Sequence, residues 1–573
     1  MTNRPPALRS RLLLYSFAAL LALAAAGLSP ASAQETDTGS IYDAPERNVT
    51  IRFDTRRTLR EIPRHFLGVN NSYFNDTDEI WEKFNIPEKL KHAGIGAMRF
   101  PGGEETSFYH WRHPGVNGYE DIWDDPSVHG TPVGRGPFQV TWVDPAQWNT
   151  NQAFLDFDEF IAHCVALNIE PIVGINMSSA RKHGRIEDGI NEALEWLRYC
   201  KEKGYEVKYW YLDNEPWHQN ANYTFDIVKE YGPDVLRYGR AIKKEFPDVK
   251  LIVNPLPWGS TRYTDYLKQF LATAGPVIDY IDLHYYWAWG LGSWDYWLQS
   301  TPLTDRDKWT KEEGHKSIGE ICNMVRSACR DLGLNDVGIM FLEWNIGPSD
   351  QTAFLSESAI ALIHGQYLME LIEADVEMTC LWPLLWRSRR EVWPEQDRFP
   401  SIIRQSEPYS LTTTAEVFAL FANLTGQTAI QADSNREDVL VISVYDPASA
   451  RIDSIVLNKR PIRQRVSLEV EEQAITRVVA SSLDLVNPAR YPLATPLADQ
   501  PSKKATLYLS PFSVSHIQFS TQPRESARQH GPASSVISHA TFPSGGRMFS
   551  FSGLFQNVGT RYFLPELDQS STR

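Results

Sequence analysis

Features that define several other classes of protein are scarce in this sequence. Only five of its 573 residues are cysteine, and none stands in a CxxC or a His-paired metal spacing. We therefore expect buried, mostly unpaired thiols with at most one or two disulfides. The net charge is −15, so the chain lacks the basic excess that is typical of nucleic-acid-binding proteins. The cysteines are Cys164, Cys200, Cys322, Cys329 and Cys380.

Long apolar runs are also lacking beyond the N-terminus. Three arginines precede the apolar segment Leu12–Leu28, and the small-residue site Ala31-Ser32-Ala33 follows it. This order is typical of a secretory signal peptide, so we expect cleavage after residue 33 and a secreted or periplasmic protein. The apolar segment is at the short limit for a bilayer span, which leaves an uncleaved anchor as the alternative. After cleavage we expect no stable membrane insertion.

Tryptophan is abundant but unevenly distributed. All 18 tryptophans lie between Trp81 and Trp393, and the last 180 residues contain none. The chain therefore has at least two compositional zones. Exposed indole rings often pack against the C–H face of a sugar, whereas buried ones fill a large core, and for any single tryptophan the core is the simpler interpretation.

From residue 60 onward, short apolar runs alternate with amphipathic stretches of helical period. Eight strand–helix pairs predict an α/β protein with a (β/α)8 TIM barrel. A doubly wound open sheet is the alternative, but no GxGxxG follows an early strand. The candidate strands are Phe66–Asn70, Ala97–Pro101, Pro171–Asn176, Lys208–Asp213, Lys250–Asn254, Ile278–His284, Gly338–Glu343 and Glu377–Pro383.

The pattern changes after the predicted barrel. Short alternating runs separated by turn residues predict a C-terminal antiparallel β-sandwich. The last residues carry only scattered apolar side chains and are expected to form a poorly ordered tail. The expected organisation is a signal peptide at 1–33, an N-terminal segment at 34–59, the catalytic barrel at 60–425, the β-sandwich at 426–520 and the tail at 521–573.

Polar and aromatic side chains stand at the carboxyl ends of the predicted strands, where barrel enzymes carry their chemistry. Glu215 follows the fourth strand and Glu343 ends the seventh, so the two carboxylates would face each other across the barrel mouth. Either glutamate alone could be a solvated charge on a loop. Two glutamates, each at a strand end, are better explained by catalysis. The full set of strand-end residues is Asn70, Arg99, Asn176, Asn214, Glu215, His284, Glu343 and Trp382.

Hydrolysis of a glycosidic bond needs such a pair of carboxyl groups. One protonates the leaving oxygen and the other attacks the anomeric carbon, at a separation of roughly 5–5.5 Å in a retaining enzyme. The acid must stay protonated near neutral pH. We expect a neighbouring carboxylate and desolvation by Trp217 to raise the pKa of Glu215, and Arg99 to keep Glu343 ionised.

These motifs resemble the retaining glycoside hydrolases of clan A, and most closely the α-L-arabinofuranosidases of glycoside hydrolase family 51. The resemblance covers about residues 60–520, and its motifs in this order are more specific than Asn-Glu-Pro alone. They are Met98-Arg99-Phe100-Pro101-Gly102-Gly103, Trp196–Cys200, Asn214-Glu215, Ile278–Tyr286, Glu343-Trp344-Asn345 and Leu509–Val514.

The resemblance implies a role for each matching residue. Glu215 would be the acid/base and Glu343 the nucleophile, with no metal or other cofactor. Asn214 would bind the sugar hydroxyl next to the anomeric carbon, and Arg99 would lie beside the nucleophile. His284 and Tyr286 would line the sugar subsite. We also expect substrate contacts from the aromatic residues near the strand ends, Trp217, Trp344 and Trp382.

The sequence departs from the family pattern at two places. Glu104, followed by Glu105, stands where the family has an asparagine that contacts the sugar, and Asp213 stands where it has glycine. Because of both departures, the sequence does not identify the sugar that is bound next to the catalytic glutamates. The insertion between Trp111 and Trp148, together with Trp287, Trp289, Trp294 and Trp297, would build tall walls around the barrel mouth.

We therefore predict a secreted retaining glycoside hydrolase, acting on a polysaccharide or oligosaccharide and best interpreted as α-L-arabinofuranosidase-like. One alternative is an endo-acting enzyme of the same clan, similar to agarases, porphyranases or xylanases. A second is a barrel that binds carbohydrate without cleaving it. A third is a metal-dependent hydrolase with His218 and His284 among its ligands, but the chain contains no HExxH or HxH motif. Nucleic acid is not an expected partner.

Overall fold

The structure is a computed structural model. It describes residues 47–523 except 74–75, 113–120, 125–153, 219–221, 257–263, 290–291, 305–315, 348–354, 386–398, 405–406 and 494–500. The predicted signal peptide, most of the expected tail and most of the insertion between Trp111 and Trp148 lie outside these residues. Among the described residues, no helix combines the length and apolar character that a bilayer span requires.

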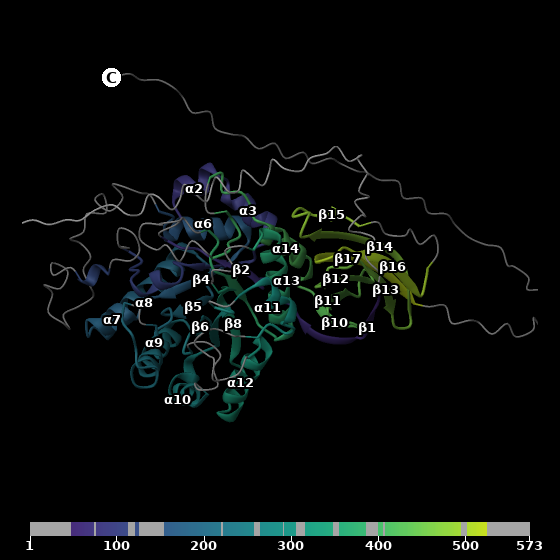
Figure 1. Cartoon of the computed structure of the whole chain (residues 1–573). Coiled ribbons are helices and arrows are strands. Elements are labelled where there is room, and N and C mark those ends of the chain that lie inside the picture. Colours follow the sequence, from purple (N-terminus) through teal and green to yellow (C-terminus); the bar gives the residue numbers. More distant parts are fainter. Residues whose placement is uncertain are drawn as a thin grey trace, which may run out of the picture. The chain divides into compact units, whose positions relative to one another are not determined.

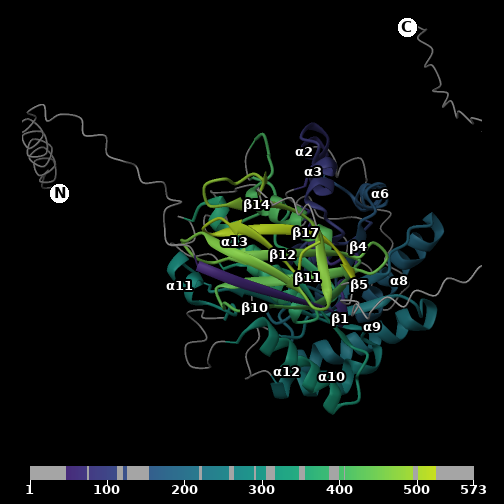
Figure 2. The same cartoon turned by 90° about the vertical axis from the view of Figure 1, so that its right-hand side faces the viewer.

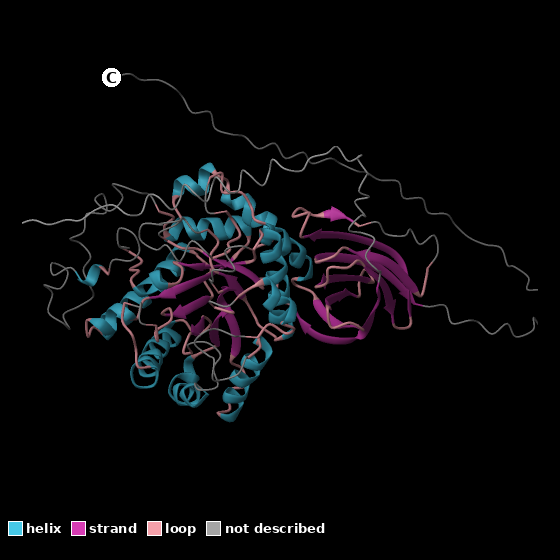
Figure 3. Ribbon diagram, in the orientation of Figure 1, coloured by secondary structure: helices cyan, strands magenta, loops and turns pink. Residues whose placement is uncertain are grey.

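Eight parallel strands form a closed barrel in the order in which they occur in the chain (Figure 1). Each predicted strand is present, so the predicted TIM barrel is confirmed. The central barrel strands and the helices outside them are distinguished by colour in Figure 3. The strands are β2 (Leu67–Asn70), β3 (Ala97–Phe100), β4 (Glu170–Ile175), β5 (Tyr209–Leu212), β6 (Lys250–Val253), β7 (Tyr280–Trp287), β8 (Gly338–Ile346) and β9 (Thr379–Leu381).

Most of the helices that accompany these strands are amphipathic, and several begin at a side-chain cap. Asp156 and Ser317 each form a capping box with the glutamate three residues later, which fixes the first turn of α6 and of α12. The helices are α2 (Asp78–Lys83), α3 (Ile86–Ala93), α6 (Phe157–Leu167), α7 (Ser178–Lys182), α8 (Ile186–Lys203), α9 (Gly232–Glu245), α10 (Thr264–Ala274), α11 (Trp294–Gln299), α12 (Ile318–Asp331), α13 (Glu357–Glu373) and α14 (Thr413–Phe421).

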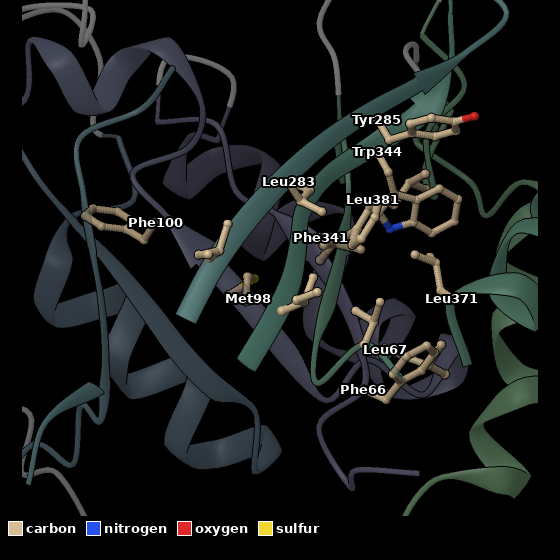
Figure 4. Packing of buried hydrophobic residues seen from close by; sticks show 14 of the residues in the cluster. Phe66, Leu67, Met98, Phe100, Leu283, Tyr285, Phe341, Trp344, Leu371 and Leu381 are labelled. Atoms are coloured by element: carbon tan, nitrogen blue, oxygen red, sulfur yellow. The ribbon is translucent and has the colours of Figure 1, made fainter. Parts of the chain in front are cut away.

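Alternating side chains of the barrel strands build two apolar layers. The inner layer includes Ala97, Ile172 and Ile252, and the outer layer joins strand residues such as Met98 and Phe341 to the helices. Part of the outer layer is drawn in Figure 4. All five cysteines are buried and unpaired, as free thiols.

The second domain is a nine-stranded, mostly antiparallel sheet around its own apolar core. Its strand order is β15-β14-β17-β12-β11-β10-β1-β13-β16. The strands are β1 (Arg47–Glu61), β10 (Thr428–Ser434), β11 (Val439–Asp446), β12 (Arg451–Asn458), β13 (Gln464–Val470), β14 (Gln473–Asp484), β15 (Tyr491–Pro492), β16 (Lys504–Leu509) and β17 (Ser513–Pro523).

The first strand corrects the expected organisation at the N-terminus. The segment 34–59 is expected to be separate from both domains, but β1 pairs antiparallel with β10 and parallel with β13 inside the sheet. The reason is that Val49, Ile51 and Phe53 alternate with more exposed residues and complete the apolar core of the sheet. Figure 2 shows β1 in purple at the N-terminal end of the colour scale, next to β10. At the other end, β17 continues to Pro523, into the expected tail.

Helix α13 joins the two domains. Every residue from Ser358 to Ile372, except Ile360, is buried. A helix that is buried on nearly all sides must be covered on nearly all sides, and the residues around α13 include Leu457 and Val514 of the sheet. The sheet therefore buries helices that the barrel alone would leave exposed.

Gly174 of β4 offers a test of the packing inside the barrel. A Cβ atom there would overlap the phenol ring of Tyr211 and lie 2.7 Å from Thr106 Cγ2. We expect Gly174→Ala to lower the free energy of unfolding by about 1–3 kcal/mol, because overpacking forces neighbouring side chains to move. Thermal and urea unfolding would measure the change.

The matched control is Gly319→Ala in α12, where a Cβ atom would meet nothing within 4 Å. Since alanine is the better helix former, this variant should be neutral or more stable, by up to about 1 kcal/mol. Equal stability of the two variants would contradict the packing described here.

Candidate active site

The candidate acid lies directly after β5, on a backbone turn of unusual conformation. Asp213 and Glu215 have φ angles of +65° and +40°. Left-handed backbone is rare for residues with a side chain and is often found at functional sites, where surrounding contacts offset the strain. The turn directs Asn214 and Glu215 into the barrel mouth, where both make contacts with other strand ends.

Asp213 explains one departure from the family pattern. Its buried carboxylate accepts hydrogen bonds from Ser107 Oγ at 2.6 Å, from the Asn214 amide at 2.8 Å and from the Met177 amide at 3.0 Å. Burial raises the pKa of this carboxyl group. Aspartate tolerates the left-handed conformation that glycine favours, and the hydrogen bonds of Asp213 fix the turn that precedes Glu215.

The second carboxylate, Glu343, reaches the barrel interior through an irregularity in β8. His284 pairs with Glu343, but Asp282 pairs with Met340, so β8 contains one extra residue between these pairs. Leu342 and Glu343 therefore both face inward. Such bulges commonly redirect a side chain beside an active site.

Glu343 is held by two donors. Tyr286 Oη donates to its Oε1 at 2.5 Å, and Arg99 Nη1 donates to its Oε2 at 3.1 Å. The guanidinium of Arg99 is fully buried and also donates to Asn70 Oδ1 at 3.1 Å and to Asn214 Oδ1 at 2.5 Å. Arg99 therefore connects the nucleophile candidate to the residue that precedes the acid candidate.

His284 lies between the two candidate carboxylates. Its Nδ1 is 2.8 Å from Glu215 Oε1 and 3.6 Å from Glu343 Oε2, and its Nε2 is 2.9 Å from Asp282 Oδ2. One oxygen of each glutamate and the ring nitrogen all lie within 4.8 Å of one another. This spacing is compatible with the separation of roughly 5–5.5 Å in retaining glycosidases.

The titration of this cluster differs from the expectation for the acid. Burial disfavours the charged imidazole, but Glu343 and Asp282 outweigh burial and raise the pKa of His284 to about 10. Burial likewise opposes ionisation of Glu215, but the hydrogen bond from His284 lowers the pKa of Glu215. The expected rise in the Glu215 pKa is therefore wrong for the substrate-free protein, because a histidine and not a tryptophan dominates its surroundings.

The three residues also meet a purely geometric criterion for a metal site. A metal-binding imidazole must present an unprotonated nitrogen. The carboxylates around His284 favour a positive charge at this position, and they raise the pKa of His284, so a proton on the imidazole can supply that charge.

An aromatic group stands beside Glu343. The rings of Tyr286, Trp289 and Phe399 contact one another, with centroids 5.3–6.0 Å apart, and Trp382 belongs to the same cluster. A Cβ atom on Gly103 would be 3.0 Å from Trp382 and 3.3 Å from Glu343 Oε2, so the backbone there packs closely against both side chains. Sequence analysis missed Phe399, because it follows no strand end and belongs to no recognised motif.

Two other predicted contacts lie near the acid. Glu104 Oε1 is 3.8 Å from His218 Nδ1, three residues beyond Glu215. Trp217 is partly buried, and its Nε1 donates to Asn254 Oδ1 at 3.2 Å.

Glu105, which the sequence marked only as a second acid, is fully buried, and Ser72 Oγ donates to it at 2.6 Å. Burial raises the pKa of Glu105 to about 7.

The expectation for Trp344 is wrong. The bulge that turns Glu343 inward turns Trp344 outward, where it is fully buried against Tyr367 and Phe418 of the helices. Figure 4 shows Trp344 within the buried apolar cluster. Trp287 and Trp297 are also fully buried and belong to the core, not to exposed walls. Of the four tryptophans expected to form the walls, Trp289 and Trp294 are partly exposed.

Comparison with known proteins supports the class of molecule that this fold and carboxylate pair define. Residues 89–289 match the family model described as "Alpha-L-arabinofuranosidase 1 domain". Alpha-L-arabinofuranosidase C of Emericella nidulans is 28% identical over 243 residues, which are 37% of this chain and 42% of that protein. The match thus spans less than half of the length of this relative.

Solved structures extend the likeness in fold beyond the matched segment. The family 51 arabinofuranosidase of Xanthomonas axonopodis pv. citri has a TM-score of 0.60 at 16% identity, covering 82% of this chain and 99% of that one. A family 44 xyloglucanase of Paenibacillus polymyxa has a TM-score of 0.57 at 14% identity, covering 83% and 100%. The predicted resemblance to clan A glycoside hydrolases is confirmed. In sequence, the chain is similar to alpha-L-arabinofuranosidases over the matched segment, and in fold it is similar to structures of family 51.

Arg99 provides a test of the site that does not require an assay of activity. Arg99→Met would leave the carboxylate of Glu343 and the amides of Asn70 and Asn214 without their buried donor. We expect the free energy of unfolding to fall by about 3–5 kcal/mol, the usual cost of breaking a buried ion pair. Urea unfolding at neutral pH would measure it.

Arg198→Met is the matched control. Arg198 forms a bidentate pair with Glu245 between α8 and α9, but both side chains are exposed. Its loss should cost under about 1 kcal/mol. Similar losses for both variants would contradict the central position of Arg99.

Proposed function

We propose that the protein is a retaining glycoside hydrolase that acts on α-L-arabinofuranosides in plant or algal polysaccharides. The observation that carries this proposal is the position of Glu215 and Glu343, whose carboxylates meet at one nitrogen of His284. The similarity to arabinofuranosidases supports the choice of sugar. We also propose export by the predicted leader, because a polymeric substrate lies outside the cell.

In the first step, Glu343 attacks the anomeric carbon and forms a glycosyl ester, while the bond to the leaving oxygen breaks. Tyr286 and Arg99 hold both oxygens of Glu343 in place, so that the attacking oxygen is already oriented. Asn214 lies next to Glu215 and shares Arg99 with the nucleophile. Its amide nitrogen remains available to a hydroxyl of the sugar.

The leaving oxygen takes a proton from the Glu215–His284 pair. This pair shares one proton along the 2.8 Å line between Nδ1 and Oε1. An imidazolium with a carboxylate and an imidazole with a carboxylic acid are two forms of the same pair, so its titration belongs to both groups. A glycosidic oxygen beside Glu215 would draw the proton onto the carboxyl group and across to the leaving group.

In the second step, water displaces Glu343 from the anomeric carbon. Formation of the ester removes the negative charge that contributes most to the raised pKa of His284. The affinity of the pair for a proton then falls, so Glu215 stays ionised after it has given its proton to the leaving group. As a carboxylate, it can accept a proton from the attacking water. The same pair thus serves first as acid and then as base.

Endo-cleavage of a polysaccharide backbone is the second candidate, and Glu104 favours it. The pair formed by Glu104 and His218 stands beside the acid, at the position of the asparagine that the family resemblance assigns to sugar binding. A carboxylate there would bind a different pattern of hydroxyl groups. An aryl α-L-arabinofuranoside, xylan, arabinan and agar-type polysaccharides would distinguish the two candidates. Free arabinose supports the first, and ladders of oligosaccharides support the second.

Glu343→Gln and Glu215→Gln test the two roles separately. We expect each variant to lose at least about 10³-fold in kcat/KM on a polysaccharide or oligosaccharide. On an aryl glycoside with an acidic leaving group, Glu343→Gln should lose as much, whereas Glu215→Gln should retain most of the first step, because that leaving group needs no proton.

The exposed residue Glu187, on α8, gives the control variant Glu187→Gln, which should keep full activity. Losses below about tenfold for both site variants would refute the two-carboxylate mechanism. Equal losses of Glu215→Gln on both kinds of substrate would refute its role as acid.

Asp282→Asn tests the shared proton. Asp282 is one of the charges that raise the pKa of His284, so its neutralisation lowers that pKa. The pair then loses its proton at lower pH, and the alkaline limb of kcat/KM should move down by roughly one to three pH units. Profiles of kcat/KM between pH 5 and about 10 would measure the shift.

Asp279→Asn is the control on the same segment. Asp279 precedes β7 and binds Lys243 and Lys250 away from the barrel mouth, so its neutralisation should leave the alkaline limb in place. An unchanged limb in Asp282→Asn would contradict the role of the pair.

A further inference from the structure

The segment that follows β7 forms part of the surroundings of the nucleophile. It consists of residues 288–289 and 292–304 among those described, and it contains α11. At its start, Trp289 packs on Tyr286, which donates to Glu343. Further along, the ring of Tyr296 stacks on Trp287 of β7, with centroids 5.3 Å apart and planes within 2°. The segment thus packs against two residues of the strand that orients Glu343.

The sheet domain contacts this segment through one buried lysine. Lys459 follows β12 and is 2% exposed. Its ammonium donates to the carbonyl oxygens of Trp297 at 2.9 Å and Ser300 at 2.8 Å and to Thr301 Oγ1 at 2.8 Å, and it lies 4.7 Å from the centre of the Trp297 ring. Three acceptors match the three donors of a charged lysine, whereas a neutral amine has only two.

Helix α13 holds the same segment from the barrel side. Gln366 Nε2 donates to the Ser300 carbonyl at 2.9 Å, and Glu370 Oε1 accepts from the Leu303 amide at 2.8 Å. Burial lowers the pKa of Lys459, and the carboxylate of Glu370 opposes that shift. Residues 297–303 are therefore fixed between two elements by buried polar side chains, which we call the Lys459 clamp.

A buried lysine at a domain boundary is costly unless it is fully paired. An apolar side chain would bury the same surface at less cost, so simple adhesion of the two domains does not require Lys459. Its three acceptors all belong to one short stretch of the segment after β7. Lys459 therefore fixes the position of residues 297–301 by its hydrogen bonds and also packs over them.

We propose that Lys459 is a positioning residue of the active site: through the Lys459 clamp, the sheet domain holds the segment after β7 against Tyr286 and Trp287, and so keeps Tyr286 on the nucleophile. The catalytic part of this inference rests on the proposed function. The sheet domain thus has a part in the reaction, and the sequence alone gave no indication of its role.

Lys459→Met removes the donors and keeps most of the apolar stem. Its matched control is Lys504→Met in β16 of the same sheet, an exposed lysine paired with Glu469. Thr301→Val is a milder second variant, since it removes one acceptor from an exposed residue. Hydrogen exchange followed by mass spectrometry, well below the melting temperature, would report on peptides that cover 294–303, and steady-state kinetics on a glycoside would report on the site.

We expect faster exchange confined to 294–303 and a loss of about tenfold in kcat/KM for Lys459→Met, because small displacements of catalytic groups are costly in rate. Thr301→Val should show the same changes to a smaller degree, and Lys504→Met neither. Unchanged exchange at 294–303 would overturn the clamp. Faster exchange with an unchanged kcat/KM would overturn the positioning role.

Exchange that rises equally in α9 and in 294–303 would indicate general destabilisation and would also overturn the inference. The two proposals fail in different ways. A wild-type protein that cleaves no glycoside would refute the proposed function and the positioning role with it, whereas the exchange experiment would still decide whether the clamp exists.

Discussion

A single buried guanidinium organises the mouth of the barrel. Arg99 comes from β3, yet it donates to residues of β2, of β8 and of the turn after β5. A buried charge must be paired, so each of these partners is fixed by the need to satisfy it. The ring of Tyr211, 4.3 Å from the guanidinium carbon, supports it from below. The positions of Glu343 and of the residue next to Glu215 follow from this one side chain.

Around Arg99, the remaining charges are arranged so that a proton can lie between His284 and Glu215. His284 faces two glutamates on one side and Asp282 on the other. Neither burial nor any one neighbour sets its protonation state alone. A site of this kind changes its proton affinity when one carboxylate loses its charge, which the two-step displacement proposed above requires. The pKa values of Glu215 and His284 are therefore controlled mainly by neighbouring charges and hydrogen bonds, and not by a hydrophobic pocket around the acid.

Much of this was accessible from the sequence. Eight apolar runs predicted the barrel, and the position of polar residues at strand ends predicted that Glu215, Glu343, Arg99 and His284 would meet. The prediction for Trp344 failed because an extra residue in β8 reverses the alternation of side chains, and no local pattern marks a bulge. Phe399 and Lys459 were missed for another reason: their contacts are made by tertiary packing far from any motif.

The position of β1 has a consequence for how the molecule is assembled. Because β1 lies between β10 and β13, the sheet is a domain into which the whole barrel is inserted. An N-terminal strand made early in synthesis must wait for partners that are made last, and until then its edges are unpaired. A fragment starting at residue 426 would lack an interior strand. Any attempt to recombine these domains must therefore keep the chain from β1 to β17 together.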